Sequence, residues 1–225
     1  MRLSSIGFIL LLAGYMPVAA LAQTTDSSLE IYAVNVVKTP PFEKQFTGYG
    51  IYLGKGLVIT AAHVVGHWPV FTHPRVLIAG QDLPATIIKK GSFEQIDLAL
   101  LSVDESGLPV SLRLRRNPIC KVPPKIGMAV IDVVPQATTS SRVISPMVIP
   151  RPLQGRFDSL ITTPKDSGSG LFDPERKCLL GIMSGKVQKF GYQRDHGRLV
   201  WAADGFAGYF VSAAKIMEFM PPNVL

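Results

Sequence analysis

The sequence predicts an all-β protein, and three observations lead to that prediction. Short runs of apolar, β-branched and aromatic residues recur along the chain, and Gly, Pro or Asp bounds most of them. Helical periodicity is almost absent before the C-terminal end. The 18 prolines are spread along the chain, which suits short strands joined by turns. These features favour barrels or a sandwich over an α/β fold.

About a dozen segments have the length and composition of strands. They span residues 29–37, 46–54, 56–64, 75–80, 84–90, 97–103, 127–134, 142–149, 159–163, 169–173, 178–185 and 207–212. Several are separated by turn sequences with a known mechanism, such as Gly54 to Gly56. Only residues 212–220 predict a helix, which Ser212 can cap and Pro221 ends.

The first residues, 1–22, predict a secretory signal peptide. Arg2 supplies a positive head, an apolar run follows, and Ala20 and Ala22 have the spacing that signal peptidase reads. An uncleaved anchor is the alternative. No later segment offers the roughly 18 uninterrupted apolar residues that a membrane span needs. We therefore expect a secreted or periplasmic protein with no integral membrane span after the signal is removed.

The remaining chain, residues 23–225, is predicted to fold as one domain of two β-rich halves. Its length of about 200 residues suits one large β domain or two small barrels that share a core. Residues 113–125 are proline-rich and charged and lack strand alternation, which is typical of a linker. The halves then span about 29–112 and 126–225.

The net charge is positive, but its distribution argues against a nucleic-acid partner. The chain carries 23 basic and 16 acidic residues, for a formal charge of +7. The basic residues are scattered, with no Arg-rich helix and no patch interleaved with aromatic residues. A solvated basic surface is the favoured interpretation, and such a surface is compatible with anionic cell-envelope surfaces.

The two cysteines, Cys120 and Cys178, predict one disulfide bond in an exported chain. It would tie the linker to a strand of the second half. Two buried free thiols are the alternative, and the spacing matches no metal site.

A serine, a histidine and an aspartate stand in sequence contexts that suit nucleophilic catalysis. Ser167 lies among small residues just before an apolar strand, and His63 follows an apolar strand and two alanines. Asp97 directly precedes an apolar run, where a carboxylate is costly unless it accepts hydrogen bonds, for example from an imidazole. A serine hydroxyl needs a base to take its proton and a carboxylate to orient that base.

Three motifs in this order, "TAAHVV", "DLALL" and "DSGSGLF", resemble those of the trypsin-like (chymotrypsin-fold) serine endopeptidases. The segments "CLLGIMSG" and "AGYFVSAAKIMEFM" resemble that family's cleft-lining strand and its last strand with the terminal helix, so the likeness covers about residues 45–220. Ser169 is closer to bacterial glutamyl endopeptidases than to pancreatic enzymes. The resemblance implies two six-stranded antiparallel β-barrels with a short C-terminal helix, a polypeptide substrate, and no cofactor or metal.

The resemblance also implies roles for individual residues. Ser167 would be the nucleophile, His63 the general base and then the general acid, and Asp97 the group that orients the imidazole. The backbone N–H groups of Lys165 and Ser167 would form the oxyanion hole. The substrate pocket would be formed by Ile161, Thr162, Met183, Ser184 and Lys186. No Asp stands at the pocket floor, and Met183 replaces the His of glutamyl endopeptidases, so an apolar substrate side chain is expected.

Two departures from the family pattern leave alternatives open. Lys165 stands where the family has Gly, and a side chain there disfavours the backbone orientation that aims this N–H into the oxyanion hole. Either the hole is unformed at rest and forms on substrate binding, or the protein is a catalytically impaired relative that acts as a binding or structural protein. The expected N-terminus also lacks an I-V-G-G-type start, so Asp166 needs another partner.

Two other readings of these motifs are weaker. His63 and His67 have helical spacing for zinc, but Gly66 breaks the helix and no Glu follows the first His. Ser169 as nucleophile would need a G-x-S-x-G elbow, and the chain order His, Asp, Ser is wrong for an α/β-hydrolase.

Overall fold

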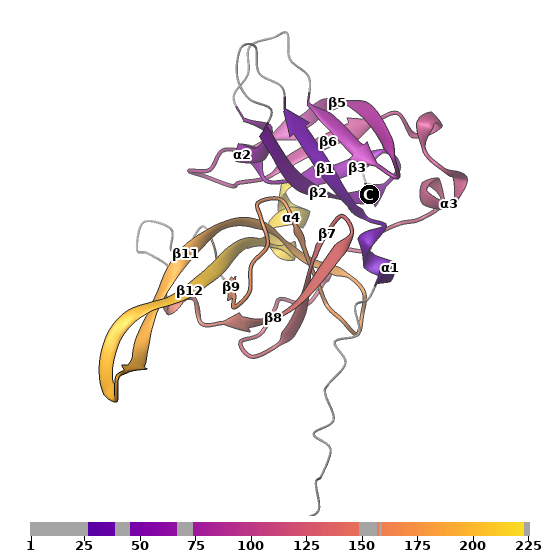
Figure 1. Ribbon diagram of the computed structural model, residues 1–225. Helices are drawn as coiled ribbons and strands as arrows, with labels where there is room; N and C mark the ends of the chain where they lie inside the picture. The colour runs from indigo at the N-terminus through magenta and orange to yellow at the C-terminus, as the bar shows by residue number, and fades with distance from the viewer. Residues whose placement is uncertain (1–26, 39–45, 67–73, 149–156, 158, 223–225) are drawn as a thin grey trace, which may run out of the picture.

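The computed structural model describes residues 27–38, 46–66, 74–148, 157 and 159–222. Within them, twelve strands form two closed barrels, with hydrogen-bonded orders β1-β2-β3-β6-β5-β4 and β10-β11-β12-β9-β8-β7. Neighbouring strands pair antiparallel throughout. Figure 1 shows the two barrels packed against each other. The predicted all-β class and the two six-stranded antiparallel barrels are confirmed.

The first barrel is built from strands with short helices around it. Its strands are β1 (Ala33–Lys38), β2 (Phe46–Gly54), β3 (Leu57–Thr60), β4 (Arg75–Ile78), β5 (Gln81–Lys90) and β6 (Ala99–Val103). The helical turns are α1 (Ser27–Glu30), α2 (Ala62–Val65), η1 (Glu105–Gly107) and α3 (Val110–Arg113). The first predicted strand, residues 29–37, begins only at Ala33, because α1 and a turn occupy its start.

The second barrel holds the longest strands of the described chain. Its strands are β7 (Ala129–Val134), β8 (Ala137–Ile144), β9 (Ser159–Ile161), β10 (Gly170–Phe172), β11 (Leu179–Asp195) and β12 (Arg198–Ser212), with the turn η2 (Pro146–Val148). Helix α4 (Ala213–Phe219) follows β12, as predicted. Ser212 occupies its N-cap position but makes no side-chain capping hydrogen bond, so that part of the prediction is wrong.

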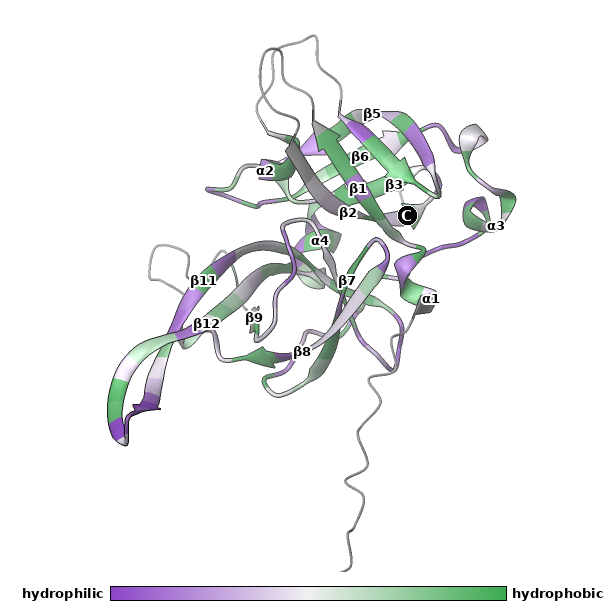
Figure 2. Cartoon of the chain, in the orientation of Figure 1, coloured by the Kyte–Doolittle hydropathy of each residue, from purple (hydrophilic) through white to green (hydrophobic). Residues whose placement is uncertain are grey.

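Three apolar clusters hold the barrels together, and Figure 2 shows hydrophobic residues concentrated in the barrel strands. Strand β6 explains the pattern: Leu98 beside it and Leu100 within it join a cluster shared by both barrels, whereas Leu101 points into the first barrel. The shared cluster also contains Ile182 of β11 and Ile216 of α4. A third cluster fills the second barrel. Because the barrels share a core, the loops at their junction are held in a defined arrangement.

The predicted disulfide between Cys120 and Cys178 is confirmed. The two Cα atoms are 5.1 Å apart, and 58 residues separate the cysteines in the sequence. An isolated bridge between Ile119 and Leu179 lies beside the bond. In the chain-entropy description, closing a loop of this length stabilises the fold by about 4 kcal/mol.

The sequence prediction missed most of the hairpin formed by β11 and β12. It placed strands at 178–185 and 207–212, whereas the two strands continue to Asp195 and from Arg198. Figure 1 shows the extra length projecting from the second barrel. A pattern was present, since Lys186 to Gln193 and Arg198 to Phe206 contain alternating apolar residues around a His-Gly turn.

The predicted signal peptide, residues 1–22, lies outside the described residues, and the boundaries of the two halves and the linker also stay predictions. Within the part of the chain that the structure describes, no helix is both long and apolar enough to cross a membrane.

Candidate active site

His63 and Asp97 meet at the end of the first barrel that faces the second. Strand β3 ends at Thr60, and His63 lies in the short helix α2 that follows directly. Asp97 immediately precedes the buried residues leading into β6, which pairs with β3 through Thr60 and Ala99. The imidazole Nδ1 is 2.7 Å from Asp97 Oδ2, and the His63 backbone N–H donates to Asp97 Oδ1 at 3.0 Å.

The buried carboxylate of Asp97 is fully satisfied by donors. It is 1 % exposed, and besides His63 it accepts a hydrogen bond on Oδ2 from the Ser184 hydroxyl of β11. A buried carboxylate is tolerated when such donors replace its lost hydration. An N–H on Nδ1 directed at the carboxylate leaves Nε2 with a free lone pair. The imidazole is 37 % exposed and can act as a base there.

The loop that carries Ser167 is pressed against the first barrel. The Ser167 carbonyl accepts from the backbone N–H of Tyr49 at 3.0 Å. Gly168 has φ of +87°, and a Cβ there would overlap the carbonyl oxygen of Tyr49, so only glycine fits. The same Tyr49 oxygen accepts from the Thr60 hydroxyl at 2.5 Å, which ties the loop to the end of β3.

The Ser167 hydroxyl lies at the same junction but is directed to another acceptor. It donates to the backbone carbonyl of Ser184 at 3.1 Å, and no hydrogen bond joins these two described side chains, Ser167 and His63. Ser184 therefore links the group: its hydroxyl contacts Asp97 and its carbonyl holds Ser167. The hydroxyl can donate to another acceptor only after rotation about the Cα–Cβ bond of Ser167 releases it from this carbonyl.

The backbone N–H of Lys165 is already engaged, and its partner is buried. It donates at 2.7 Å to Oδ2 of Asp132, which is a residue of strand β7. Of the two N–H groups expected to form an oxyanion hole, that of Lys165 is therefore bound to a side chain in this conformation. Both alternatives that the sequence leaves open, a hole that forms on substrate binding and a catalytically impaired relative, are compatible with this contact.

Asp132 is an unusual group to find in a barrel interior. It is fully buried, and burial raises the pKa of its carboxyl to about 6. The Ser169 hydroxyl, the Lys165 amide and the positive charges of Lys165 and Lys186 oppose this shift. The Ser169 hydroxyl is near the carboxyl, but the two do not form a hydrogen bond of good geometry: Asp132 Oδ1 and Ser169 Oγ each lack a hydrogen-bond partner among the described residues. At neutral pH the ionised carboxylate is a strong acceptor for the Lys165 N–H.

We expect the free energy of unfolding of Asp132→Asn to increase, relative to that of the native protein, as the pH rises. The native carboxyl has its pKa raised to about 6, so the stability it contributes is present below about pH 4 and lost as the pH rises through 6. Asparagine does not titrate and keeps an acceptor for Lys165. The difference in unfolding free energy should therefore grow by on the order of 3 kcal/mol between about pH 4 and pH 7 in urea titrations. Parallel stability curves for the two proteins would contradict it.

The residues expected to form the substrate pocket lie in different surroundings in this structure. Ile161 and Met183, predicted as pocket residues, are both fully buried and belong to the core of the second barrel. A Cβ on Gly208 would overlap Met183 and Pro164, so side chains fill the space beside β12. Both side chains pack in the barrel core in this conformation, and their role in a substrate pocket stays a prediction. Thr162 instead contacts the Ser141 hydroxyl at 3.2 Å and lines a separate cavity of about 410 Å³.

Lys186, also predicted to line the pocket, forms an ion pair with Asp166. Its Nζ is 2.8 Å from Asp166 Oδ1, and both side chains are substantially exposed. Asp166 was expected to need a partner other than a new N-terminus, and Lys186 supplies one. An exposed pair of this kind contributes little to stability, about 0–1 kcal/mol, so it does not lock the loop.

Two residues of the site were missed from the sequence. Asp132 lies in an otherwise apolar strand, and a lone carboxylate in such a run was the available signal. Tyr209 of β12 lies against Gly185, and its pKa is raised by burial and, secondarily, by the charge of Asp97. It also packs on Phe157 with ring centroids 4.6 Å apart. No sequence spacing connects Tyr209 with Asp97.

Comparison with solved structures identifies the architecture as the chymotrypsin fold of the trypsin-like serine proteases. The Rv3671c protease of Mycobacterium tuberculosis matches in its active form with 20% identity and a TM-score of 0.58, covering 86% of this chain and 81% of that chain. Its inactive form matches with 18% identity and a TM-score of 0.54, covering 86% and 89%.

The protease domain of MamO from Magnetospirillum magneticum, in its apo form, matches with 18% identity and a TM-score of 0.54, covering 86% of this chain and 97% of that domain. At these identities the likeness establishes the fold. No protein-family model and no curated protein sequence matches the chain.

Proposed function

We propose that the protein is a serine endopeptidase in which Ser167, His63 and Asp97 form the catalytic triad. The observation that carries the proposal is a chain of contacts: His63 binds Asp97, Asp97 accepts from the Ser184 hydroxyl, and the Ser184 carbonyl accepts from the Ser167 hydroxyl. The carboxylate already orients the imidazole through Nδ1, which is the arrangement that a general base needs. The fold of the protease neighbours supports the same reaction class.

The chemistry follows the acyl-enzyme route. The Ser167 oxygen attacks the carbonyl carbon of a peptide bond while His63 Nε2 takes the hydroxyl proton. The tetrahedral intermediate collapses, the C–N bond breaks, and the imidazolium returns the proton to the leaving amine. In the second half, His63 takes a proton from a water molecule, which attacks the acyl ester. The ester bond breaks, the carboxylic acid leaves, and the Ser167 oxygen recovers its proton from the imidazolium. Asp97 stays ionised and stabilises the imidazolium.

This conformation is the resting state of the proposed enzyme. Two local changes precede catalysis: rotation of the Ser167 hydroxyl from Ser184 towards His63, and release of the Lys165 N–H from Asp132. The rotation exchanges one hydrogen bond for another, so its net free-energy cost is small. The second costs more, because a charge-assisted bond to a buried carboxylate breaks and a non-glycine residue must change its backbone conformation. The Rv3671c protease, which shares the fold, is known in an active and an inactive form, and this supports a fold that admits an active and a resting state.

A second candidate function rests on the same Lys165 contact. A protein in which Asp132 holds the Lys165 N–H permanently would keep the fold without hydrolysis and act as a binding or structural protein. Core packing of Met183, where the substrate pocket was expected, favours this candidate as well.

A fluorophosphonate probe separates the two candidates. We expect the probe to form an adduct that peptide mapping places on Ser167, and His63→Ala to abolish it, because the imidazole must take the hydroxyl proton. Ser169→Ala is the matched control: this neighbouring serine is buried beside Asp132, and its loss should leave the adduct in place. A folded protein that never reacts with the probe or cleaves any member of a peptide library would favour the non-catalytic candidate.

Export is part of the proposal. The signal-like residues 1–22 and the disulfide between Cys120 and Cys178 support a secreted or periplasmic protein, because such bonds persist in oxidising compartments. N-terminal sequencing of the protein recovered outside the cytoplasm should begin at Gln23.

A further inference from the structure

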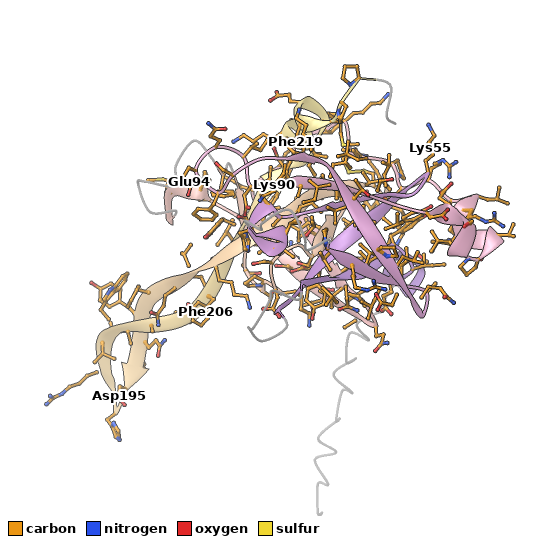
Figure 3. The ribbon with its side chains drawn as sticks, turned by 90° about the horizontal axis from the view of Figure 1, so that it is seen from above. Lys55, Lys90, Glu94, Asp195, Phe206 and Phe219 are labelled. Atoms are coloured by element: carbon orange, nitrogen blue, oxygen red, sulfur yellow. A yellow bond between two sulfur atoms is a disulfide. The ribbon has the colours of Figure 1, made fainter. Side chains whose placement is uncertain are left out.

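The hairpin of β11 and β12 extends well beyond the second barrel and ends in a two-residue turn. His196 and Gly197 have φ of +46° and +81°, as tight two-residue hairpin turns require. Figure 3 shows Asp195 at the far end of the hairpin and Phe206 between that end and the body of the protein. Two strands alone are marginal in water, so a second surface is expected to cover one face.

The strand register assigns each side chain of the hairpin to one of two faces. Gln188 pairs with Phe206, Phe190 with Ala203, Tyr192 with Trp201, and Arg194 with Leu199. Residues directly opposite one another share a face, as do alternate residues of β11. The pairing register shifts between Gln188 and Phe190, so Phe206 takes its face from its partner Gln188 and not from alternation along β12. One face, the aromatic face, therefore carries Phe190, Tyr192, Leu199, Trp201 and Phe206. All five are exposed, with fractions between 53% for Phe206 and 73% for Tyr192.

The opposite face of the hairpin is small and polar. It pairs Gly191 with Ala202, Gln193 with Val200, and Asp195 with Arg198. The side chain of Asp204 also lies on this side, within 4 Å of where a Cβ of Gly191 would be. The hairpin is thus amphipathic, with its large apolar side chains on one face and its carboxylates away from it.

The aromatic face is preorganised. Tyr192 and Trp201 meet edge to face with centroids 5.0 Å apart, and Phe190 stacks on Trp201 at 6.5 Å. These contacts hold the rings in place while leaving most of their surface in water. A contiguous exposed patch of this kind marks an interaction site.

The charges on the aromatic face select the partner. Lys186 and Arg194 are the ionisable side chains that the alternation of β11 places on it, and Lys186 is partly neutralised by Asp166. A second copy docked through this face would bring no carboxylate of the hairpin to Arg194. Trp and Tyr flanked by Arg and Lys instead match a membrane surface, where aromatic rings sit at the headgroup level and cations meet anionic lipids.

We propose that the aromatic face of the β11–β12 hairpin docks flat on an anionic phospholipid bilayer. Because Ser184 of the candidate active site lies in β11 just before the hairpin, docking holds that site beside the membrane. Binding to lipid is independent of hydrolysis, so this proposal and the proposed function can fail separately.

Sedimentation with vesicles tests the proposal on the full mature chain. We expect the protein to bind vesicles of equal parts phosphatidylglycerol and phosphatidylcholine, to bind phosphatidylcholine alone more weakly, and to lose binding at high salt. Trp201→Ser should weaken binding by about tenfold or more, since its ring supplies the largest apolar contact. Arg194→Gln should weaken it about fivefold, as expected for one cation at an anionic surface.

Neighbouring residues on the opposite face supply matched controls. Leu199→Ser should weaken binding, whereas Val200→Ser, one residue along the same strand, should not; likewise Arg198→Gln should bind as the native protein does. Because these side chains are exposed, unfolding midpoints should stay close to native and confirm folded variants. No binding to anionic vesicles, or equal losses from both faces, would overturn the proposal. So would a dimer in solution that Leu199→Ser or Trp201→Ser makes monomeric, since the aromatic face would then pack on a second copy.

Discussion

Lys165→Gly is expected to increase the rate at which Ser167 is acylated by roughly tenfold to a hundredfold. Turning the Lys165 N–H from Asp132 towards the oxyanion position requires a backbone conformation that costs a non-glycine residue about 1–3 kcal/mol, and glycine removes that cost. The hydrogen bond to Asp132 still opposes the change, so the gain stays below the hundredfold to thousandfold value of a complete donor. The second-order rate constant for fluorophosphonate labelling measures the effect.

Lys55→Gly is the control for this experiment. Lys55 lies in the turn between β2 and β3, has φ of +54° and is exposed, so glycine fits there equally well without touching the site. It should leave the labelling rate unchanged. A Lys165→Gly protein that folds normally but labels at the native rate would show that the Lys165 peptide does not limit reactivity.

Asp97→Asn is expected to lower the acylation rate by about 10⁴-fold. The carboxylate now accepts from His63 Nδ1 and from the Ser184 hydroxyl, and an amide NH₂ cannot accept either bond. With a donor facing it, Nδ1 becomes the acceptor and the proton moves to Nε2, which can then no longer take the proton of Ser167. The Lys165→Gly background gives the largest starting rate for this comparison.

Asp82→Asn controls for the change in net charge, because Asp82 pairs with Arg75 on the exposed surface of the first barrel. Its labelling rate should match that of the native protein. Thermal unfolding separates a lost base from a lost fold, since one buried partner is removed in Asp97→Asn. An intact Asp97→Asn protein with native reactivity would remove Asp97 from the triad.

Much of the fold followed from residue patterns that act locally. The apolar run at residues 97–103 predicted a strand, and alternation within β6 sends Leu100 and Leu101 to different clusters. The pairing of His63 with Asp97 followed from a resemblance of short motifs and from the cost of a buried carboxylate beside a strand. Predicting the disulfide between Cys120 and Cys178 required only that the chain has two cysteines and is expected to be exported to an oxidising compartment.

The site's details depended on contacts that no local pattern encodes. Asp132 and Lys165 are far apart in the sequence, and their hydrogen bond arises because β7 pairs with β10, the strand that follows the Ser167 loop. Met183 could be placed in a pocket or a core with equal ease, since an apolar residue suits both, and packing against Gly208 decided for the core. The hairpin length was missed because its small residues, such as Gly191 and Ala202, dilute the strand signal.

Residue patterns alone were enough to predict the class of fold and the cysteine pair and to select the three side chains proposed as the triad, because periodicity and residue chemistry are local properties. Only the tertiary structure decided where the Ser167 hydroxyl and the Lys165 amide are directed, because each chooses among acceptors that arrive from distant strands. The same reason applies to the aromatic face: which side chains share it depends on how β11 and β12 pair, and pairing is a property of the folded chain.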